Sequence, residues 1–111
     1  MFLRKLLLAC AIATLAGAAM ADDGQTLYQD NCRKCHGADG TARTARGYLY
    51  FAQDLTRPAW QARHSDDDIF RLISDGPGGW SAMPAYRKRL TDAERRALVQ
   101  AVRAFGTTPA R

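Results

Sequence analysis

The segment NCRKCHGADG, residues 31–40, places two thiols and an imidazole within five residues. Cys32 and Cys35 are separated by two basic residues, and His36 follows directly. Such a group of side chains can bind a metal ion, form a redox-active disulfide, or attach a haem covalently. Each use requires different support from the rest of the chain, so the remaining sequence has to distinguish among them.

The first 21 residues have the pattern of an export signal. Arg4 and Lys5 give a positively charged start, residues 6–15 are apolar, and Ala19-Met20-Ala21 supplies a small-x-small cleavage pattern. The apolar stretch is short and rich in Ala and Gly compared with the roughly 20 strongly apolar residues of a spanning helix. We therefore expect residues 1–21 to be a cleaved signal peptide and residues 22–111 to form one domain in the periplasm. Retention of the signal as a membrane anchor is the alternative, and only then is membrane contact expected.

The domain that remains is small and needs support beyond its own packing. It keeps only two cysteines and one methionine, Met83, because the other cysteine and methionines lie in the signal. A disulfide between Cys32 and Cys35 would close a very short loop and would stabilise the fold little. About ninety residues bury a limited core, and domains of this size are often completed by a cofactor.

The charge of this domain is modest. Removal of Arg4 and Lys5 leaves 14 of the 16 Lys and Arg against 11 Asp and Glu, a net charge of +3. This balance does not indicate nucleic-acid binding. It favours a weak attraction to acidic partners.

Three helices are predicted, with loops rich in Gly and Pro between them. The first covers residues 23–35, where Gly24, Tyr28 and Cys32 lie four apart on one face. The second and third begin at capping boxes, Ser65-x-x-Asp68 and Thr91-x-x-Glu94, and end before Gly76 and Gly106. Residues 37–64 have weak periodicity and stay unassigned. No hairpin signal and no alternation of strands and helices is present, so the predicted fold class is all-α.

Two of the three uses of the cysteines and histidine fit this chain poorly. A structural zinc site is closed by four ligands, and His64 is the only other histidine or cysteine outside the signal. A thioredoxin-like dithiol lies at the start of a helix that follows a strand. Cys32 and Cys35 instead end a predicted helix.

Covalent haem attachment fits better, because Cys-x-x-Cys-His is the attachment pentapeptide. Two residues between the thiols match the spacing of two haem vinyl groups, and the imidazole of His36 then projects from the same turn towards the iron. With this motif the chain resembles the small class I c-type cytochromes over nearly all of residues 22–111. The resemblance rests on a helix leading into CRKCHG, a middle helix, a Gly-rich loop with Met83-Pro84, and a last helix. Gly24 and Tyr28 stand where the family packs a small residue and an aromatic against that last helix.

The resemblance implies a fold and a site. The first and last helices are expected to pack against each other around one haem c, attached through Cys32 and Cys35. His36 is the expected proximal iron ligand and Met83 the expected distal ligand. The protein is then an electron-transfer protein and not an enzyme, although it could be the electron-transfer subunit of one.

The assignment of Met83 also has support from its own surroundings. It lies in the loop DGPGGWSAMPAY, whose glycines permit close backbone approach, and Pro84 favours an extended conformation for the residue before it. A methionine is more often a core residue, and His64 is the rival ligand. Thioether ligation would raise the reduction potential.

Several further expectations concern the surroundings of the haem. The candidates for an apolar shell are Trp60, Trp80, Tyr48, Tyr50 and Phe51, and Trp80 is the one expected to contact the haem or its propionates. In the family the proximal imidazole donates to a carbonyl in a proline-containing loop. No proline lies between His36 and Pro58 here, so that acceptor cannot be placed.

Three functions remain open at this point. The leading one is a periplasmic one-electron carrier between a dehydrogenase or cytochrome complex and an acceptor such as an oxidase. The alternative is a haem c subunit of a larger oxidoreductase complex, which a large exposed apolar patch would favour. The third is a gas-binding or peroxidatic haem protein. Redox partner proteins with an acidic docking surface are expected, because basic residues flank the site on both sides: Arg33, Lys34, Arg43, Arg46, Arg87, Lys88 and Arg89.

Overall fold

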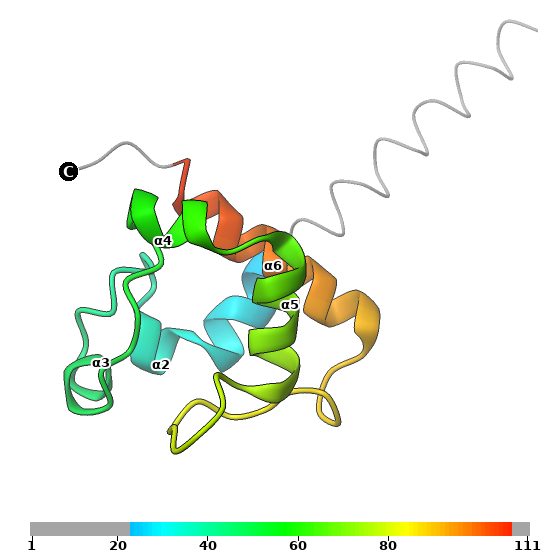
Figure 1. Ribbon diagram of the computed structural model, residues 1–111, viewed down its shortest axis with the longest axis horizontal. Coiled ribbons are helices and arrows are strands. Elements are labelled where there is room, and N and C mark those ends of the chain that lie inside the picture. The colour runs from blue at the N-terminus through cyan, green and yellow to red at the C-terminus, as the bar shows by residue number, and fades with distance from the viewer. Residues whose placement is uncertain (1–22, 108–111) are drawn as a thin grey trace, which may run out of the picture.

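The computed structural model describes residues 23–107, and within them every regular element is a helix. Residues 23–31 form the N-terminal helix, which continues after a turn at Cys32 (Figure 1). The helices that follow are α2 (Arg33–His36), α3 (Ala45–Leu49), α4 (Pro58–Arg63), α5 (Asp66–Asp75) and α6 (Asp92–Phe105). The predicted all-α class is confirmed for this part of the chain. The predicted signal peptide, residues 1–21, lies outside the described residues.

The two longest labelled helices begin where the sequence predicts. At α5 the hydroxyl of Ser65 accepts from the Asp68 N–H at 3.1 Å, and the Ser65 N–H donates to the Asp68 carboxylate at 3.1 Å. Thr91 and Glu94 make the same reciprocal pair at α6, at 3.1 and 2.9 Å. Each pair satisfies two backbone N–H donors that a helix start otherwise leaves without partners.

The unassigned residues 37–64 contain two short helices. The α3 helix has five residues and starts at Thr44, whose hydroxyl accepts from the Gly47 N–H at 2.8 Å. The α4 helix has six residues and starts with Pro58, whose fixed φ suits a first helical position. Both helices are too short to display an apolar period, which is why the sequence pattern does not reveal them.

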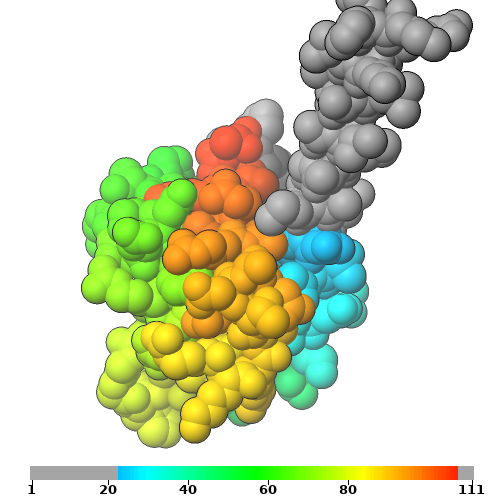
Figure 2. Space-filling model, turned by 90° about the vertical axis from the view of Figure 1, so that its right-hand side faces the viewer, coloured from blue at the N-terminus to red at the C-terminus, as the bar shows by residue number. Residues whose placement is uncertain are grey.

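The N-terminal helix packs against α6, as expected for the first and last helices. A Cβ on Gly24 would lie 2.5 Å from the carbonyl oxygen of Ala97, so only glycine permits this close approach. Tyr28 is fully buried, and its ring centroid lies 4.9 Å from that of Phe105. Figure 2 shows α6 in orange between the N-terminal segment in cyan and the green residues of α4 and α5.

A buried arginine joins α5 to α6. Arg95 is 4 % exposed and donates to the hydroxyl of Ser74 and, at 2.7 Å, to the carboxylate of Asp92. Its guanidinium carbon also lies 4.9 Å from the centre of the Phe70 ring. A buried charge is costly unless it is paired and hydrogen-bonded, and here both conditions are met.

The core draws on the N-terminal helix, α4, α5, α6 and the loops between them. Its buried residues are Tyr28, Leu55, Trp60, Ile69, Ile73, Tyr86, Leu98, Val99, Ala101 and Val102. No helix within residues 23–107 has the length and apolar character that a membrane span requires.

Candidate functional site

Much of this core lines a cavity in the middle of the domain. The cavity has a volume of about 430 Å³, within the range of about 300–1,000 Å³ that is typical of ligand sites. Its apolar walls are formed by Tyr28, Leu55, Trp60, Ile69, Leu72, Ile73, Leu98 and Val102. The fold therefore leaves a ligand-sized apolar cavity at the place where a domain of this length would otherwise have a core filled by side chains.

A second cavity of about 190 Å³ adjoins the first. Both are lined by Cys32, His36, Gln53, Pro77 and Met83. Cys35 lines the second cavity as well. All four sequence-predicted site residues thus border one pair of adjoining spaces, although Met83 is far from the other three along the chain.

The helix end at Cys32 brings the two thiols and the imidazole into one turn. The carbonyl of Cys32 accepts from the N–H groups of Cys35 and His36 at 3.3 and 3.0 Å. Gly37 then ends α2 with φ of 81°, and its carbonyl accepts from the buried Tyr28 hydroxyl at 2.6 Å. A positive φ suits glycine far better than other residues. Cys32 and Cys35 are free thiols and form no disulfide.

The α3 helix supports this turn from outside. The Thr44 hydroxyl lies 2.8 Å from the carbonyl oxygen of Cys35, and it also accepts the N–H of Gly47. A Cβ on Gly47 would lie 2.6 Å from the same Cys35 oxygen, so α3 packs directly on the backbone of α2. Sequence reasoning missed Thr44 and Gly47. The only signal was a capping residue three positions before a glycine.

His36 is oriented by a backbone carbonyl. Its Nδ1 lies 2.9 Å from the carbonyl oxygen of Gln53, and because a carbonyl only accepts, Nδ1 carries the proton. The Nε2 atom is then unprotonated and able to bind a metal. Burial lowers the pKa of His36, and the Gln53 hydrogen bond opposes that effect only in part, so the ring is neutral near pH 7. Gln53 therefore supplies the acceptor that could not be placed from the sequence.

The Cys32 thiol does not have the character of a cysteine in a reactive dithiol. Burial, together with the nearby Cys35, raises the pKa of Cys32 to about 12. Thioredoxin-like cysteines require the opposite shift. Among residues 23–107 no three His, Cys, Asp or Glu side chains come together as a metal-binding group.

Met83 lies half-buried in the long loop between α5 and α6. The loop is tied back to α5 by hydrogen bonds from the Tyr86 and Arg87 N–H groups to the carbonyls of Ile73 and Ser74, both 2.9 Å. The Arg87 guanidinium also binds the Asp75 carboxylate through two contacts of 2.7 Å. These ties hold the loop across the cavity, with Met83 lining it.

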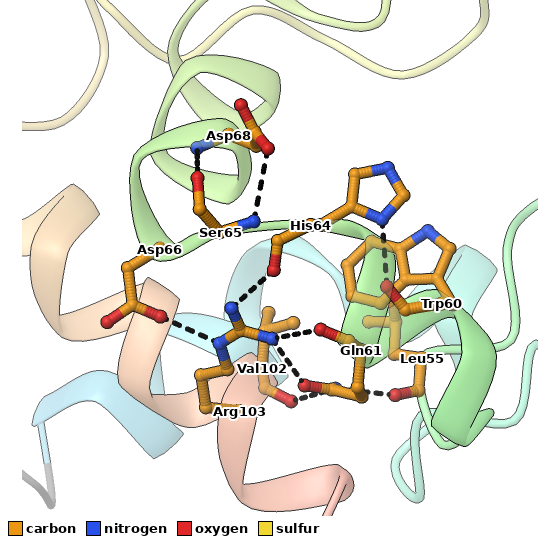
Figure 3. A network of polar contacts seen from close by, with 9 residues as sticks. All are labelled: Leu55, Trp60, Gln61, His64, Ser65, Asp66, Asp68, Val102 and Arg103. Atoms are coloured by element: carbon orange, nitrogen blue, oxygen red, sulfur yellow. Dashed lines mark hydrogen bonds and ion pairs between the residues drawn. The ribbon is translucent and has the colours of Figure 1, made fainter.

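His64 also lines the larger cavity, so the rival ligand lies near the same space. Its Nδ1 is 2.9 Å from the carbonyl oxygen of Trp60, and its ring stacks on the Trp60 indole with centroids 4.6 Å apart. Arg103 of α6 donates to the carbonyls of His64 and Gln61 and to the Asp66 carboxylate (Figure 3). The wall that carries Trp60 and His64 is thereby fastened to α6.

The aromatic residues expected around the haem divide into two groups. Trp60 is buried in the wall of the larger cavity, while Tyr50 and Phe51 line the smaller one. Tyr48 and Trp80 are 70 % and 86 % exposed and line neither cavity. The loop turns the Trp80 side chain to solvent, and its contact with the haem or its propionates stays a prediction.

The residues present fit a covalently bound haem. Two free thiols at the attachment spacing, an imidazole with an unprotonated Nε2, and a thioether border one apolar space. Imidazole and thioether are the donor pair of the cytochromes c.

The helical fold and the haem-attachment segment define a small class I c-type cytochrome. A solved structure titled KustC0563 c-type cytochrome is similar, with 35 % sequence identity and a TM-score of 0.66. The match covers 74 % of this chain and 95 % of that one. More particularly, residues 19–100 match the family described as cytochrome c oxidase, cbb3-type, subunit III, and the chain belongs to this family.

Curated relatives agree with this family. The cbb3-type cytochrome c oxidase subunit CcoP of Azospirillum brasilense is 34 % identical over 89 residues, which cover 80 % of this chain and 30 % of the relative. The FixP subunit of Rhizobium etli is 31 % identical over 93 residues, covering 84 % of this chain and 30 % of the relative. The chain thus spans about a third of the length of these relatives. It is an electron-transfer cytochrome c domain of the kind found in an oxidase subunit.

Proposed function

We propose that the chain carries one haem c, attached through Cys32 and Cys35 and ligated by His36 and Met83, and passes single electrons within a cbb3-type oxidase complex. The observation that carries this proposal is the convergence of His36 and Met83 on the same two adjoining cavities. One haem is proposed because the sequence contains one Cys-x-x-Cys-His segment.

Each residue has a defined task in this proposal. The haem supplies an iron that alternates between the ferrous and ferric states. Cys32 and Cys35 provide two thioether attachments on one helical turn. The Gln53 carbonyl fixes the tautomer and orientation of His36, whose Nε2 is the proximal donor. The Met83 thioether is the distal donor and favours the reduced state, which raises the potential.

The apolar walls of the larger cavity also affect the reduction potential of the proposed haem. Leu55, Trp60, Ile69 and Leu98 exclude water from the larger cavity. A low dielectric disfavours the additional positive charge of the oxidised site, so these walls also raise the potential. Two protein ligands leave no open position for oxygen or peroxide, which makes electron transfer the expected chemistry.

Membership of the subunit III family favours a component of the oxidase over a free shuttle between complexes. The exposed side chains of Tyr48, Leu49, Tyr50 and Phe51 also favour this role, since a contiguous group of large apolar side chains marks an interaction surface. The export pattern of residues 1–21 supports a periplasmic position for the domain. Basic residues on both flanks support redox partners with acidic docking surfaces.

Three measurements on the purified holo-protein test the proposal. The oxidised spectrum should contain the near-infrared band of sulfur-to-iron charge transfer, and the reduced protein should not bind carbon monoxide. Added to a cbb3-type oxidase purified without its subunit III, the reduced holo-protein should also restore oxygen uptake. Ready carbon monoxide binding would favour a gas-binding or peroxidatic protein instead, and oxygen uptake that does not respond to the protein would rule out the oxidase role.

A further inference from the structure

Tyr86 connects the loop of residues 76–91, which we call the Met83 loop, to the helix end that carries Cys32. Its phenol oxygen lies 3.1 Å from the carbonyl oxygen of Asn31, the residue directly before Cys32. Because a carbonyl only accepts, the phenol donates this hydrogen bond. Among the described residues, no other hydrogen bond and no ion pair joins the Met83 loop to residues 23–36. One side chain therefore makes the polar connection between the proposed attachment residues and the loop of the proposed distal ligand.

The Asn31 carbonyl is available because the helix is interrupted at Cys32. In an uninterrupted helix it would accept from the N–H four residues later, which belongs to Cys35. The Cys35 N–H instead donates to the Cys32 carbonyl at 3.3 Å. A partly buried carbonyl needs a donor, and the Tyr86 phenol takes the place of the helical N–H. Both Asn31 and Tyr86 line the smaller cavity, as Cys35 and Met83 do.

Tyr86 is itself held firmly. It is only 6 % exposed, and its N–H donates to the carbonyl of Ile73 in α5 at 2.9 Å. Its own carbonyl accepts from the N–H groups of Arg89 and Leu90, both at 3.0 Å. Burial raises the pKa of the phenol, so the hydroxyl keeps the proton that it donates. Through its backbone and its side chain, this one residue joins α5 to the end of the N-terminal helix.

The part of the Met83 loop that precedes Met83 is held less well. Gly78 and Gly79 have positive φ values of 81° and 64°, and a Cβ on either would meet no atom within 4 Å. The Met83 N–H donates at 3.1 Å to the Ser81 hydroxyl, which belongs to the same loop. Tyr86, three residues after Met83, is the buried residue of the Met83 loop. The position of Met83 therefore depends on the residues that follow it.

We propose that Tyr86 is a positioning residue for the distal ligand, because its hydrogen bond to Asn31 holds the Met83 loop against the helix end that carries Cys32 and His36. The Met83 thioether leaves the iron when the loop moves away from this helix end, and that movement breaks the bond. A bond that is made in one state and lost in the other favours the first state. This inference rests on the proposed function, since ligation by Met83 is part of that proposal.

The test measures how fast imidazole displaces Met83 in the oxidised, full-length holo-protein. At saturating imidazole, the decay of the near-infrared band reports the rate at which the thioether leaves the iron. Tyr86→Phe removes the hydroxyl and keeps the ring. Ser65→Ala is the matched control, because it also removes one hydroxyl that bonds one backbone group, the Asp68 N–H at 3.1 Å. Ser65 lines neither of the two cavities.

We expect both substitutions to lower the melting temperature by similar amounts, since each removes one hydrogen bond to the backbone. Tyr86→Phe should in addition accelerate the displacement of Met83 by about three- to tenfold, which corresponds to the loss of one such bond from the closed state. Ser65→Ala should leave the displacement rate within about twofold of wild type, because distant sites act independently.

The outcomes separate this inference from the proposed function. A wild type that lacks the near-infrared band, or whose band persists in Met83→Ala, would overturn ligation by Met83 and the positioning role that rests on it. A wild type with the band, and equal displacement rates in Tyr86→Phe and Ser65→Ala, would overturn the positioning role and leave the ligation intact. Acceleration in both variants in proportion to their loss of melting temperature would assign the effect to general stability and would also overturn the positioning role.

Discussion

Met83 and His64 both line the larger cavity, so position alone does not separate the two candidate distal ligands. Their restraints differ. His64 is stacked on Trp60 and held through its Nδ1, whereas the hydrogen bond at Met83 runs from its backbone N–H to the Ser81 hydroxyl and does not involve the thioether. We predict that Met83→Ala abolishes the near-infrared band of the oxidised holo-protein and lets the reduced protein bind carbon monoxide. Absorption spectra of both oxidation states provide the measurement.

His64→Ala is the matched control for this prediction. It removes the rival imidazole from the same cavity and should keep the band at wild-type intensity. If His64→Ala loses the band while Met83→Ala keeps it, the distal assignment is wrong and His64 is the ligand.

At the residue scale, the proposed attachment and ligand residues could be predicted from the sequence, but the groups that orient them could not. Cys32, Cys35 and His36 follow from one local motif, and Met83 from its place before a proline. The Gln53 carbonyl could not be named, because any residue offers the same backbone acceptor and only the path of the chain selects one. The orientation of Trp80 could not be predicted for a related reason. Proximity to Met83 in sequence does not determine which way a Gly-rich loop turns its side chain.

At the scale of elements, Arg103 joins α4 and α5 to α6. Its guanidinium donates to the carbonyl of Gln61 at 2.7 Å, to the carboxylate of Asp66 at 2.7 Å, and to the carbonyl of His64 (Figure 3). Hydrogen bonds that involve a charged group contribute about 1.5–3 kcal/mol each, and several share one side chain here. We predict that Arg103→Ala lowers the free energy of unfolding by roughly 2–3 kcal/mol. Urea titration of the holo-protein measures the change.

Arg57→Ala is the comparison variant. Arg57 is an exposed arginine whose contact with Asp54 is 3.8 Å long, and exposed pairs of this kind contribute less than about 1 kcal/mol. Equal losses of stability in the two variants would mean that the network around Arg103 does not fasten α4 to α6.

The capping box of α5 predicts a specific dependence on pH. Hydrogen bonds from the Ser65 N–H and hydroxyl, with a smaller effect of Arg71, hold the pKa of Asp68 below its ordinary value. A carboxylate with a lowered native pKa stabilises the fold above its unfolded pKa of about 3.9, and this contribution disappears as the pH falls through the native pKa. We predict that, as the pH falls from about 5 to about 2, Asp68→Asn loses less of its free energy of unfolding than the wild type loses.

Thermal unfolding at a series of pH values measures this effect. Asp67→Asn is the matched control, because it removes the same charge one residue away and leaves the capping box in place. If Asp68→Asn and Asp67→Asn lose the same thermal stability on acidification, the capping box is not the source of the pH dependence.

The elements differ in how well the sequence specifies them. The α5 and α6 helices have capping boxes and enough turns for an apolar stripe, so their starts could be predicted to the residue. The α3 and α4 helices have one or two turns, and their positions depend on tertiary contacts such as the Thr44 bond to Cys35. The sequence could not specify them because a helix of this length is not stable without its surroundings.

For the whole molecule, the core and the proposed haem site share most of their residues. Tyr28, Trp60, Ile69, Leu98 and Val102 belong both to the buried core and to the wall of the larger cavity. The cavity is therefore not separate from the hydrophobic core, because the same side chains form both. The group that occupies the cavity supplies the centre of the packing.

This arrangement predicts that the protein without haem does not hold its fold. An empty apolar cavity costs about 24 cal/mol per Å³, so a cavity of about 430 Å³ has an upper-bound cost of about 10 kcal/mol. That value equals the whole stability of many domains, which is about 5–15 kcal/mol. The variant Cys32→Ser/Cys35→Ser, purified without haem, should show reduced helical ellipticity and no cooperative thermal transition, whereas the holo-protein should show both. Addition of free haem to the variant should restore part of the ellipticity, because the walls and His36 remain. A cooperative transition of the haem-free variant close to that of the holo-protein would mean that the walls collapse on each other and that the domain has a core of its own.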